Sequence, residues 1–228
     1  MATSISGISS MATRQILGEL TQRYETKAGA KVAIKAMGGV DAAKVVREGE
    51  ATDIVILASG PMAKLEAEGH LVAGSVKPFT RSGMAISVPA RGARPDIGDE
   101  AAVKHAVFAA RTVGYSTGPS GDHLLSLCAK WGIPADSERL VKAPPGVPVG
   151  SLVAEGKADL GFQQLSELIN VPGTVVLGPL PPEIQSVTVF AAGVASTSKQ
   201  KAETAALIAY LTSPETAAVK QAQGMEQA

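Results

Sequence analysis

Apolar runs along this chain alternate with stretches in which apolar residues recur at helical spacing. Residues 54–58 are apolar throughout, which is typical of a strand buried on both faces of a parallel sheet. Residues 10–28 place Ile16 and Leu20 on one helix face, and Gly29 follows as a helix C-cap would. This alternation of strand and helix predicts an α/β fold with parallel sheets.

The same pattern predicts the remaining elements. Further strands are expected at residues 3–8, 32–37, 84–88, 112–116, 140–142, 160–163, 174–177 and 185–194. Further helices are expected at residues 40–49, 61–68, 99–110, 121–131, 149–155, 167–169, 202–211 and 214–223.

The alternation begins afresh after residue 80, which predicts two lobes. The first lobe is expected to comprise residues 1–80 and 195–228, and the second residues 83–185. Residues 81–82 and 186–194 would be the hinge crossovers, because the long apolar run 185–194 can carry the chain back to the first lobe. We therefore expect two Rossmann-like lobes joined by crossing strands, with a central cleft at the carboxyl ends of strands.

Four junctions between a strand and a helix are rich in glycine, serine or proline. They span residues 7–11, 37–41, 116–121 and 145–151. Each puts free backbone N–H groups and small side chains at a helix N-terminus, where the macrodipole favours negative charge. Two junctions fall in each predicted lobe, so the sequence predicts a small polar or anionic ligand held from both sides.

Composition narrows the class of partner and cofactor. The chain has 45% hydrophobic and 18% charged residues and a net charge of zero, with no basic run, so nucleic acid is not expected as a partner. The single cysteine, Cys128, excludes an internal disulfide and fits a buried small hydrophobe. The three histidines are far apart in sequence, so we expect no metal site and no other cofactor.

The N-terminal segment bears on the compartment. Residues 1–7 lead directly into a strand, without a basic region followed by a long apolar one. No stretch reaches the ~18 apolar residues needed to span a bilayer. We therefore expect no membrane span, and a cytoplasmic location as the sequence is written or a periplasmic one if a signal segment was removed. The sequence leaves both compartments open.

Several phrases of the sequence carry a family resemblance. Ser9-Ser10 opens the first helix, Gly38-Gly39 opens the second, and residues 47–56 read as a helix end, a glycine, acidic residues and an apolar strand. Residues 6–71 thereby resemble the first lobe of periplasmic solute-binding proteins of the molybdate-binding type, in the type II periplasmic-binding-protein superfamily. Residues 159–162 and 205–226 resemble that family's late strand and closing helices.

The resemblance implies a ligand-binding set drawn from the four junctions. In that family, hydroxyls and backbone amides hold an oxyanion without counter-ions. The implied residues are Ser9, Ser10, Gly38, Gly39, Ser120, Gly121, Val149, Gly150 and Gln164. Gly39 stands where an oxyanion binder would carry a second serine, and Gln164 where molybdate binders tend to have tyrosine.

Charged residues near these turns each have a structural and a functional interpretation. Asp41 and Asp122 lie in the first turns of helices, where they complement the helix dipole, accept hydrogen bonds from ligand hydroxyls or act as a base. Arg81 is a bidentate clamp for a ligand carboxylate or a solvated arginine. His123 is a surface residue or a proton donor. Because carboxylates near the amide donors would repel molybdate, we expect a ligand with carboxylate and hydroxyl or carbonyl groups to fit better.

Two function classes follow from these observations. The first is a solute-binding protein of the ABC-transporter type, which captures a small oxyanion or carboxylate by hinge closure. We expect it to be a monomer with an ABC-transporter permease as partner. The alternative is a cytoplasmic isomerase on the same scaffold, which moves a proton in a small carboxylate with Asp122, His123 or Asp41 as base. A ligand sensor is a third class, but no DNA-binding segment accompanies it.

Overall fold

The structure is a computed structural model that describes residues 4–228. Thr3, where the first predicted strand begins, lies outside the described residues, as do Met1 and Ala2. The chain forms two compact units. Unit 1 contains the described residues up to Arg81 together with Thr188–Ala228, and unit 2 is Ser82–Val187. The lobe limits expected at residues 80, 83, 185 and 195 stay predictions.

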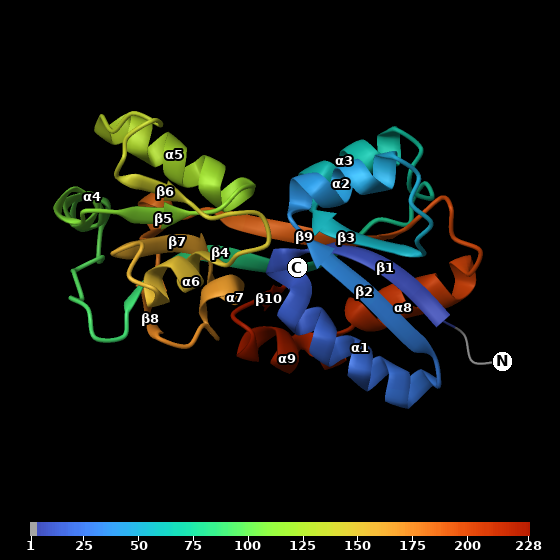
Figure 1. Cartoon of the computed structure of the whole chain (residues 1–228). Coiled ribbons are helices and arrows are strands. Elements are labelled where there is room, and N and C mark those ends of the chain that lie inside the picture. The colour runs from blue at the N-terminus through green and yellow to red at the C-terminus, as the bar shows by residue number, and fades with distance from the viewer. Residues whose placement is uncertain (1–3) are drawn as a thin grey trace. The chain divides into compact units, whose positions relative to one another are not determined.

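Unit 1 is a sheet with helices on both faces (Figure 1). Its strands are β1 (Ser4–Ser10), β2 (Lys31–Met37), β3 (Ile54–Ala58), β9 (Val187–Val194), which enters from unit 2, and β10 (Glu226–Gln227). Its helices are α1 (Arg14–Ala28), α2 (Gly39–Arg47), α3 (Ser59–Ala67), α8 (Lys201–Leu211) and α9 (Ala217–Ala222). Strand β1 lies between β2 and β3 and is parallel to both, whereas β9 is antiparallel to β3.

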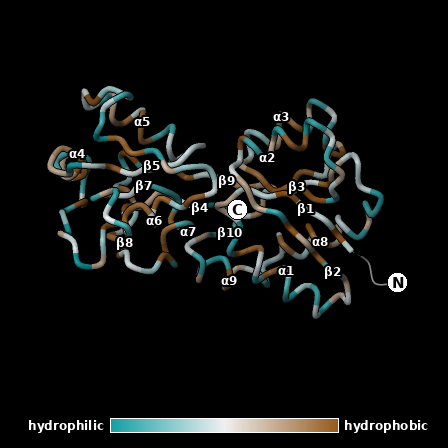
Figure 2. The backbone as a smooth tube through the Cα atoms, in the orientation of Figure 1, coloured by the Kyte–Doolittle hydropathy of each residue, from teal (hydrophilic) through white to brown (hydrophobic). Residues whose placement is uncertain are grey.

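The central strand β3 serves two cores. Its residues Ile54 and Ile56 pack into a cluster with α1 and α8, and Val55 and Leu57 pack with α2 and α3. This follows because successive side chains of a strand point to opposite faces. Figures 1 and 2 show α2 and α3 on one face of this sheet, α1 and α8 on the other, and hydrophobic residues along the strands. The prediction of a strand buried on both faces is confirmed.

Unit 2 has the same alternation in a smaller sheet. Its strands are β4 (Lys77–Pro89), which enters from unit 1, β5 (Val113–Tyr115), β6 (Leu140–Lys142), β7 (Leu160–Gln164) and β8 (Thr174–Pro179). Its helices are α4 (Glu100–Ala109), α5 (Pro119–Trp131), α6 (Val149–Ala154) and α7 (Leu165–Leu168). Strand β5 lies between β6 and β7 and is parallel to both. Helices α4 and α5 share one core, and α6 packs in a separate one.

The structure corrects the sequence-based expectations at three places. The sheets are mixed and not purely parallel, because β4 pairs antiparallel with β7 and β8, and β9 with β3. Strand β4 has 13 residues where only 84–88 were expected, since polar residues and Pro78 mask its first half. Strand β10 lies after the last predicted helix, where no element is expected, because two residues carry no periodicity.

The start of the first helix also differs. Residues Met11–Thr13 form a 3-10 turn before α1, where the sequence predicted one helix from residue 10. Ser10 is the extended residue that precedes this turn. As a result Ser9 and Ser10 both belong to the end of β1, and they point to opposite faces of the sheet.

Candidate ligand-binding site

The carboxyl end of β1 carries two buried hydroxyls that lack partners. Ser9 is 0% and Ser10 7% exposed, and within residues 4–228 neither Oγ atom has a hydrogen-bond partner. A buried hydroxyl without a partner costs about 1–3 kcal/mol. Because Ser9 and Ser10 point to opposite faces of the sheet, each hydroxyl is a separate candidate contact for a water or a ligand.

The start of α2 lies beside one of these hydroxyls. Ser10 is in register with Met37, the last residue of β2, and a side-chain carbon placed on Gly39 would lie 4.0 Å from Ser10 Cβ. The cap residue Gly38 gives the helix no side-chain cap. The first N–H groups of a helix lack intrahelical partners, and the dipole makes this end positive. Unit 1 thus combines a buried hydroxyl with an open, positive helix end.

Asp41 folds back over the start of its own helix. It is exposed, and its Oδ2 atom would lie 3.2 Å from a side-chain carbon placed on Gly38. A carboxylate at this place complements the helix dipole. A glycine at position 38 is therefore favoured for a steric reason, because it leaves room for the Asp41 carboxylate.

A second polar edge lies in unit 2, where β5 leads into α5. The Oγ atoms of Ser116 and Ser120 are 3.2 Å apart, and Ser120 is 4% exposed. The cap residue Gly118 has φ of 90°, which favours glycine, and provides no side-chain cap. Because β5 and β7 are parallel, this turn and the end of β7 meet at the same edge of the sheet.

Gly121 and Gly150 have packing roles in this unit. A side-chain carbon on Gly121 would lie 1.7 Å from the Ser116 carbonyl oxygen, and one on Gly150 would lie 2.8 Å from Val171. Both glycines are thus required where α5 and α6 touch their neighbours. The structure gives steric reasons for these residues, which the sequence suggested as ligand contacts.

The amide of Val149, expected to face a ligand, is already bonded. It donates to Gln163 Oε1 at 2.8 Å, and Gln163 Nε2 donates to Glu167 Oε1 at 2.7 Å. Gln163 and the neighbouring Gln164 are each 2% exposed at the end of β7. A polar network therefore joins the starts of α6 and α7.

Glu167 was not singled out from the sequence. It is partly buried, and burial raises the pKa of its carboxyl to about 8, with the Gln163 bond as a smaller, opposing influence. The only signal for Glu167 in the sequence is its position four residues after Gln163, at the end of a strand. The same spacing is equally common on exposed helix turns, so it does not predict a buried carboxyl.

Three charged candidates have other contacts within their own units. Arg81 pairs with Glu226 of β10, with Nη2 2.7 Å from Oε2, and both side chains are largely exposed. His123 Nε2 lies 2.7 Å from the Ile184 carbonyl oxygen, which requires Nε2 to carry a proton. Asp122 is exposed at the start of α5. Arg81 and His123 thus each have a partner within the protein.

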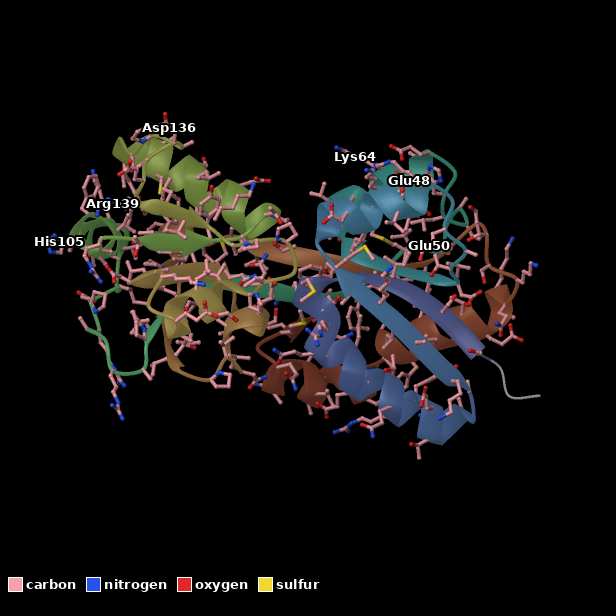
Figure 3. The ribbon with its side chains drawn as sticks, in the orientation of Figure 1. Glu48, Glu50, Lys64, His105, Asp136 and Arg139 are labelled. Atoms are coloured by element: carbon pink, nitrogen blue, oxygen red, sulfur yellow. The ribbon has the colours of Figure 1, made fainter. Side chains whose placement is uncertain are left out.

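The remaining chemistry-bearing residues lie apart from these edges. Cys128 is buried in α5, and burial raises the pKa of its thiol to about 11. Figure 3 labels His105 on α4, and Glu48 and Lys64 near the last turns of α2 and α3, away from the N-terminal end of α2. Among residues 4–228, His, Cys, Asp and Glu side chains form no group of three suited to a metal ion.

The family model for bacterial extracellular solute-binding proteins matches residues 5–226. The chain belongs to this family. A relative named aconitate isomerase, from Pseudomonas sp, is 32% identical over 231 residues, which cover 98% of this chain and 88% of the relative. In the described part of this solute-binding protein, no helix has the length and apolar character to cross a bilayer.

Solved structures confirm the fold of this family member. The periplasmic molybdate-binding protein of Azotobacter vinelandii has a TM-score of 0.80 at 20% identity, covering 97% of this chain and 98% of that one. The tungstate ABC transporter structure from Geobacter sulfurreducens has a TM-score of 0.75 at 19% identity, covering 95% and 97%. The predicted two-lobe, periplasmic-binding-protein-like α/β fold and the resemblance to molybdate-binding proteins are confirmed.

Proposed function

We propose that this solute-binding protein captures a small carboxylate anion and that Ser10 and the start of α2 form one of its contacts. The observation that carries the proposal is the buried Ser10 Oγ without a partner, next to a helix end without a side-chain cap. Hydroxyl and backbone N–H donors of this kind bind anions without a counter-ion. The match to aconitate isomerase supports a carboxylate, since aconitate is a tricarboxylate.

The comparison with oxyanion binders supports the same choice of ligand. The structural neighbours are named for molybdate and tungstate. The family resemblance implies a second serine in an oxyanion binder where this chain has Gly39, so one hydroxyl donor would be missing. Losing a hydrogen bond to a charged group costs about 1.5–3 kcal/mol. We therefore expect molybdate to bind at least tenfold more weakly than it binds to a dedicated oxyanion binder, and a ligand with carboxylate and hydroxyl or carbonyl groups to fit better.

Ser10→Ala is expected to weaken carboxylate binding by roughly 10- to 150-fold, the equivalent of one charge-assisted hydrogen bond. The same change should leave the free energy of unfolding unchanged or slightly higher, because it removes an unsatisfied buried hydroxyl. Isothermal titration calorimetry with aconitate, citrate and molybdate measures the affinity, and urea unfolding measures the stability.

Ser213→Ala is the matched control for this experiment. Its Oγ is also buried without a partner, but it lies in the turn after α8. It should leave the affinity unchanged. Gly39→Ser, for which there is room beside Ser10, adds the missing hydroxyl and should strengthen molybdate binding. Equal affinities of Ser10→Ala and the unaltered protein would contradict the proposal.

The proposal extends to unit 2 and to partners. We propose Ser120, a buried serine at the start of α5, as a second ligand contact, so Ser120→Ala should also weaken binding. Solute-binding proteins of the ABC type deliver ligand to a permease, and we propose a permease as partner of a monomeric protein. Sedimentation with and without ligand tests the monomer.

A second candidate function is isomerisation of a small carboxylate. The specific observation is the 32% identity to an aconitate isomerase over 98% of this chain. A base would take a proton from carbon, and a proton would return at another carbon as the double bond shifts, so that no oxidant is needed. The proposed bases are Asp122, His123 and Asp41.

Incubation with aconitate in D2O is expected to interconvert its isomers and place deuterium on carbon, which proton NMR detects. Asp122→Asn should slow this exchange at least tenfold, whereas Asp136→Asn, an exposed acidic residue of the same unit, should not. Tight binding without deuterium incorporation would exclude the isomerase and leave the binding function.

A further inference from the structure

A hydrogen-bonded chain in unit 2 ends on a carboxyl group. The amide of Val149 at the start of α6 donates to Gln163, and Gln163 donates to Glu167 Oε1. Because the Gln163 oxygen is used by Val149, its amide nitrogen must face Glu167. Within residues 4–228 this is the one hydrogen bond of the Glu167 side chain.

The place of this carboxyl in the fold is the polar edge of unit 2. Strand β7 ends at Gln164, and Glu167 lies in the short helix that follows. Strand β5 lies between β6 and β7 and is parallel to both, so the carboxyl ends of all three strands reach the same edge. Ser116 and Ser120 lie at the end of β5, and Val149 lies at the turn after β6.

Within residues 4–228, no cation forms an ion pair with Glu167. The elements packed on α7 are α6 and β7, and neither contains a charged side chain; the part of β4 in unit 2 contains none either. The other titratable groups at this edge are Tyr115 and Lys142, the last residues of β5 and β6, and Asp122 and His123 on α5. A carboxyl that is partly buried without a counter-charge favours its neutral form.

We propose that Glu167 holds a proton at the polar edge of unit 2: its protonated carboxyl donates a hydrogen bond to an anion bound at this edge, and its ionised form repels that anion. This inference rests on the proposed anion-binding function. A neutral carboxylic acid at this position would favour ligands that have a strong hydrogen-bond acceptor. It would also couple ligand binding to proton uptake. Gln163 is the positioning residue that orients this carboxyl.

The sign of the pH dependence follows from the position of the pKa. The pKa of Glu167 is raised to about 8, so the group is mostly protonated at neutral pH. Above that pH, the free protein must take up a proton before it binds the anion in this way. The affinity should then fall up to about tenfold for each further pH unit.

Calorimetric titration with aconitate between pH 7 and 9.5 tests the inference, because the ligand carboxylates stay ionised throughout this range. In buffers of different ionisation enthalpy, proton uptake should be small at pH 7 and approach one proton per ligand at pH 9.5. Glu167→Gln replaces the carboxyl by an amide that cannot ionise, so this variant should lose both the decrease in affinity with pH and the proton uptake.

Glu138→Gln is the matched control, since it makes the same chemical change at an exposed carboxylate of unit 2. It should keep the pH dependence. A carbon-13 NMR titration of the glutamate carboxyls, assigned with Glu167→Gln, reads the group without ligand, and a titration midpoint below pH 6 would overturn the inference. Binding that is independent of pH in the unaltered protein would overturn it too and leave the proposed function standing. Absence of binding to aconitate, citrate and molybdate would remove both.

Discussion

Replacing Lys220 by methionine is expected to lower the free energy of unfolding by about 3 kcal/mol or more. Lys220 is 0% exposed, and its Nζ donates to the Phe79 and Leu211 carbonyl oxygens at 2.8 Å and to Gln227 Oε1 at 2.7 Å. The ammonium also lies 4.8 Å from the centre of the Phe79 ring. Burial lowers the pKa of Lys220 to about 8, so the amine remains charged at pH 7.

The size of the effect follows from what methionine leaves behind. It fills a similar space but donates nothing, so the Phe79 carbonyl oxygen and Gln227 Oε1 lose this donor. The Leu211 carbonyl oxygen keeps its bond from Thr216 Oγ1. Each unsatisfied buried group costs about 1–3 kcal/mol.

Urea unfolding followed by circular dichroism measures the loss. Lys201→Met, at an exposed lysine of α8, is the control and should change stability by less than about 0.5 kcal/mol. A loss below 1 kcal/mol at Lys220 would show that other donors replace the amine.

Gly121→Ala is expected to be comparably damaging, with a loss of about 3 kcal/mol. The added carbon would lie 1.7 Å from the Ser116 carbonyl oxygen and 2.9 Å from its carbonyl carbon, so backbone must move against backbone. The start of α5 would then shift and carry Ser120 with it. Thermal unfolding should show a lower midpoint.

Gly18→Ala is the control with the opposite sign. Gly18 lies within α1, and a side-chain carbon there would meet nothing within 4 Å. Alanine in a helix interior is favoured over glycine by about 0.5–1 kcal/mol, so this variant should be more stable. Equal midpoints for both variants would contradict the close approach of α5 to Ser116.

The regular elements were predictable because their patterns are local. The apolar run of β3 predicts a buried strand, and the glycine after α1 predicts the end of a helix; each signal lies within a few residues. The first half of β4 was not predictable, since its pairing partner β10 is distant in sequence. The antiparallel course of β9 was missed for the same reason.

The candidate site was predictable in its backbone and less so in its side chains. Ser9 and Ser10 were identified from the junction, but no pattern states that their hydroxyls would lack partners. The glycine positions were found, but close packing at Gly121 is invisible in a sequence. Glu167 and Lys220 read as ordinary helix-surface residues, because their burial depends on neighbours brought together by folding.

Cys128 has a practical consequence for measuring motion in this protein. The chain has one cysteine, which is buried and has its thiol pKa raised to about 11, so little reactive thiolate exists in the native state. Cysteines introduced at the exposed positions Glu48 in unit 1 and Asp136 in unit 2 (Figure 3) would be labelled selectively without removing it. A pair of fluorescent dyes at these positions would report, molecule by molecule, how the distance between the units changes when ligand is added.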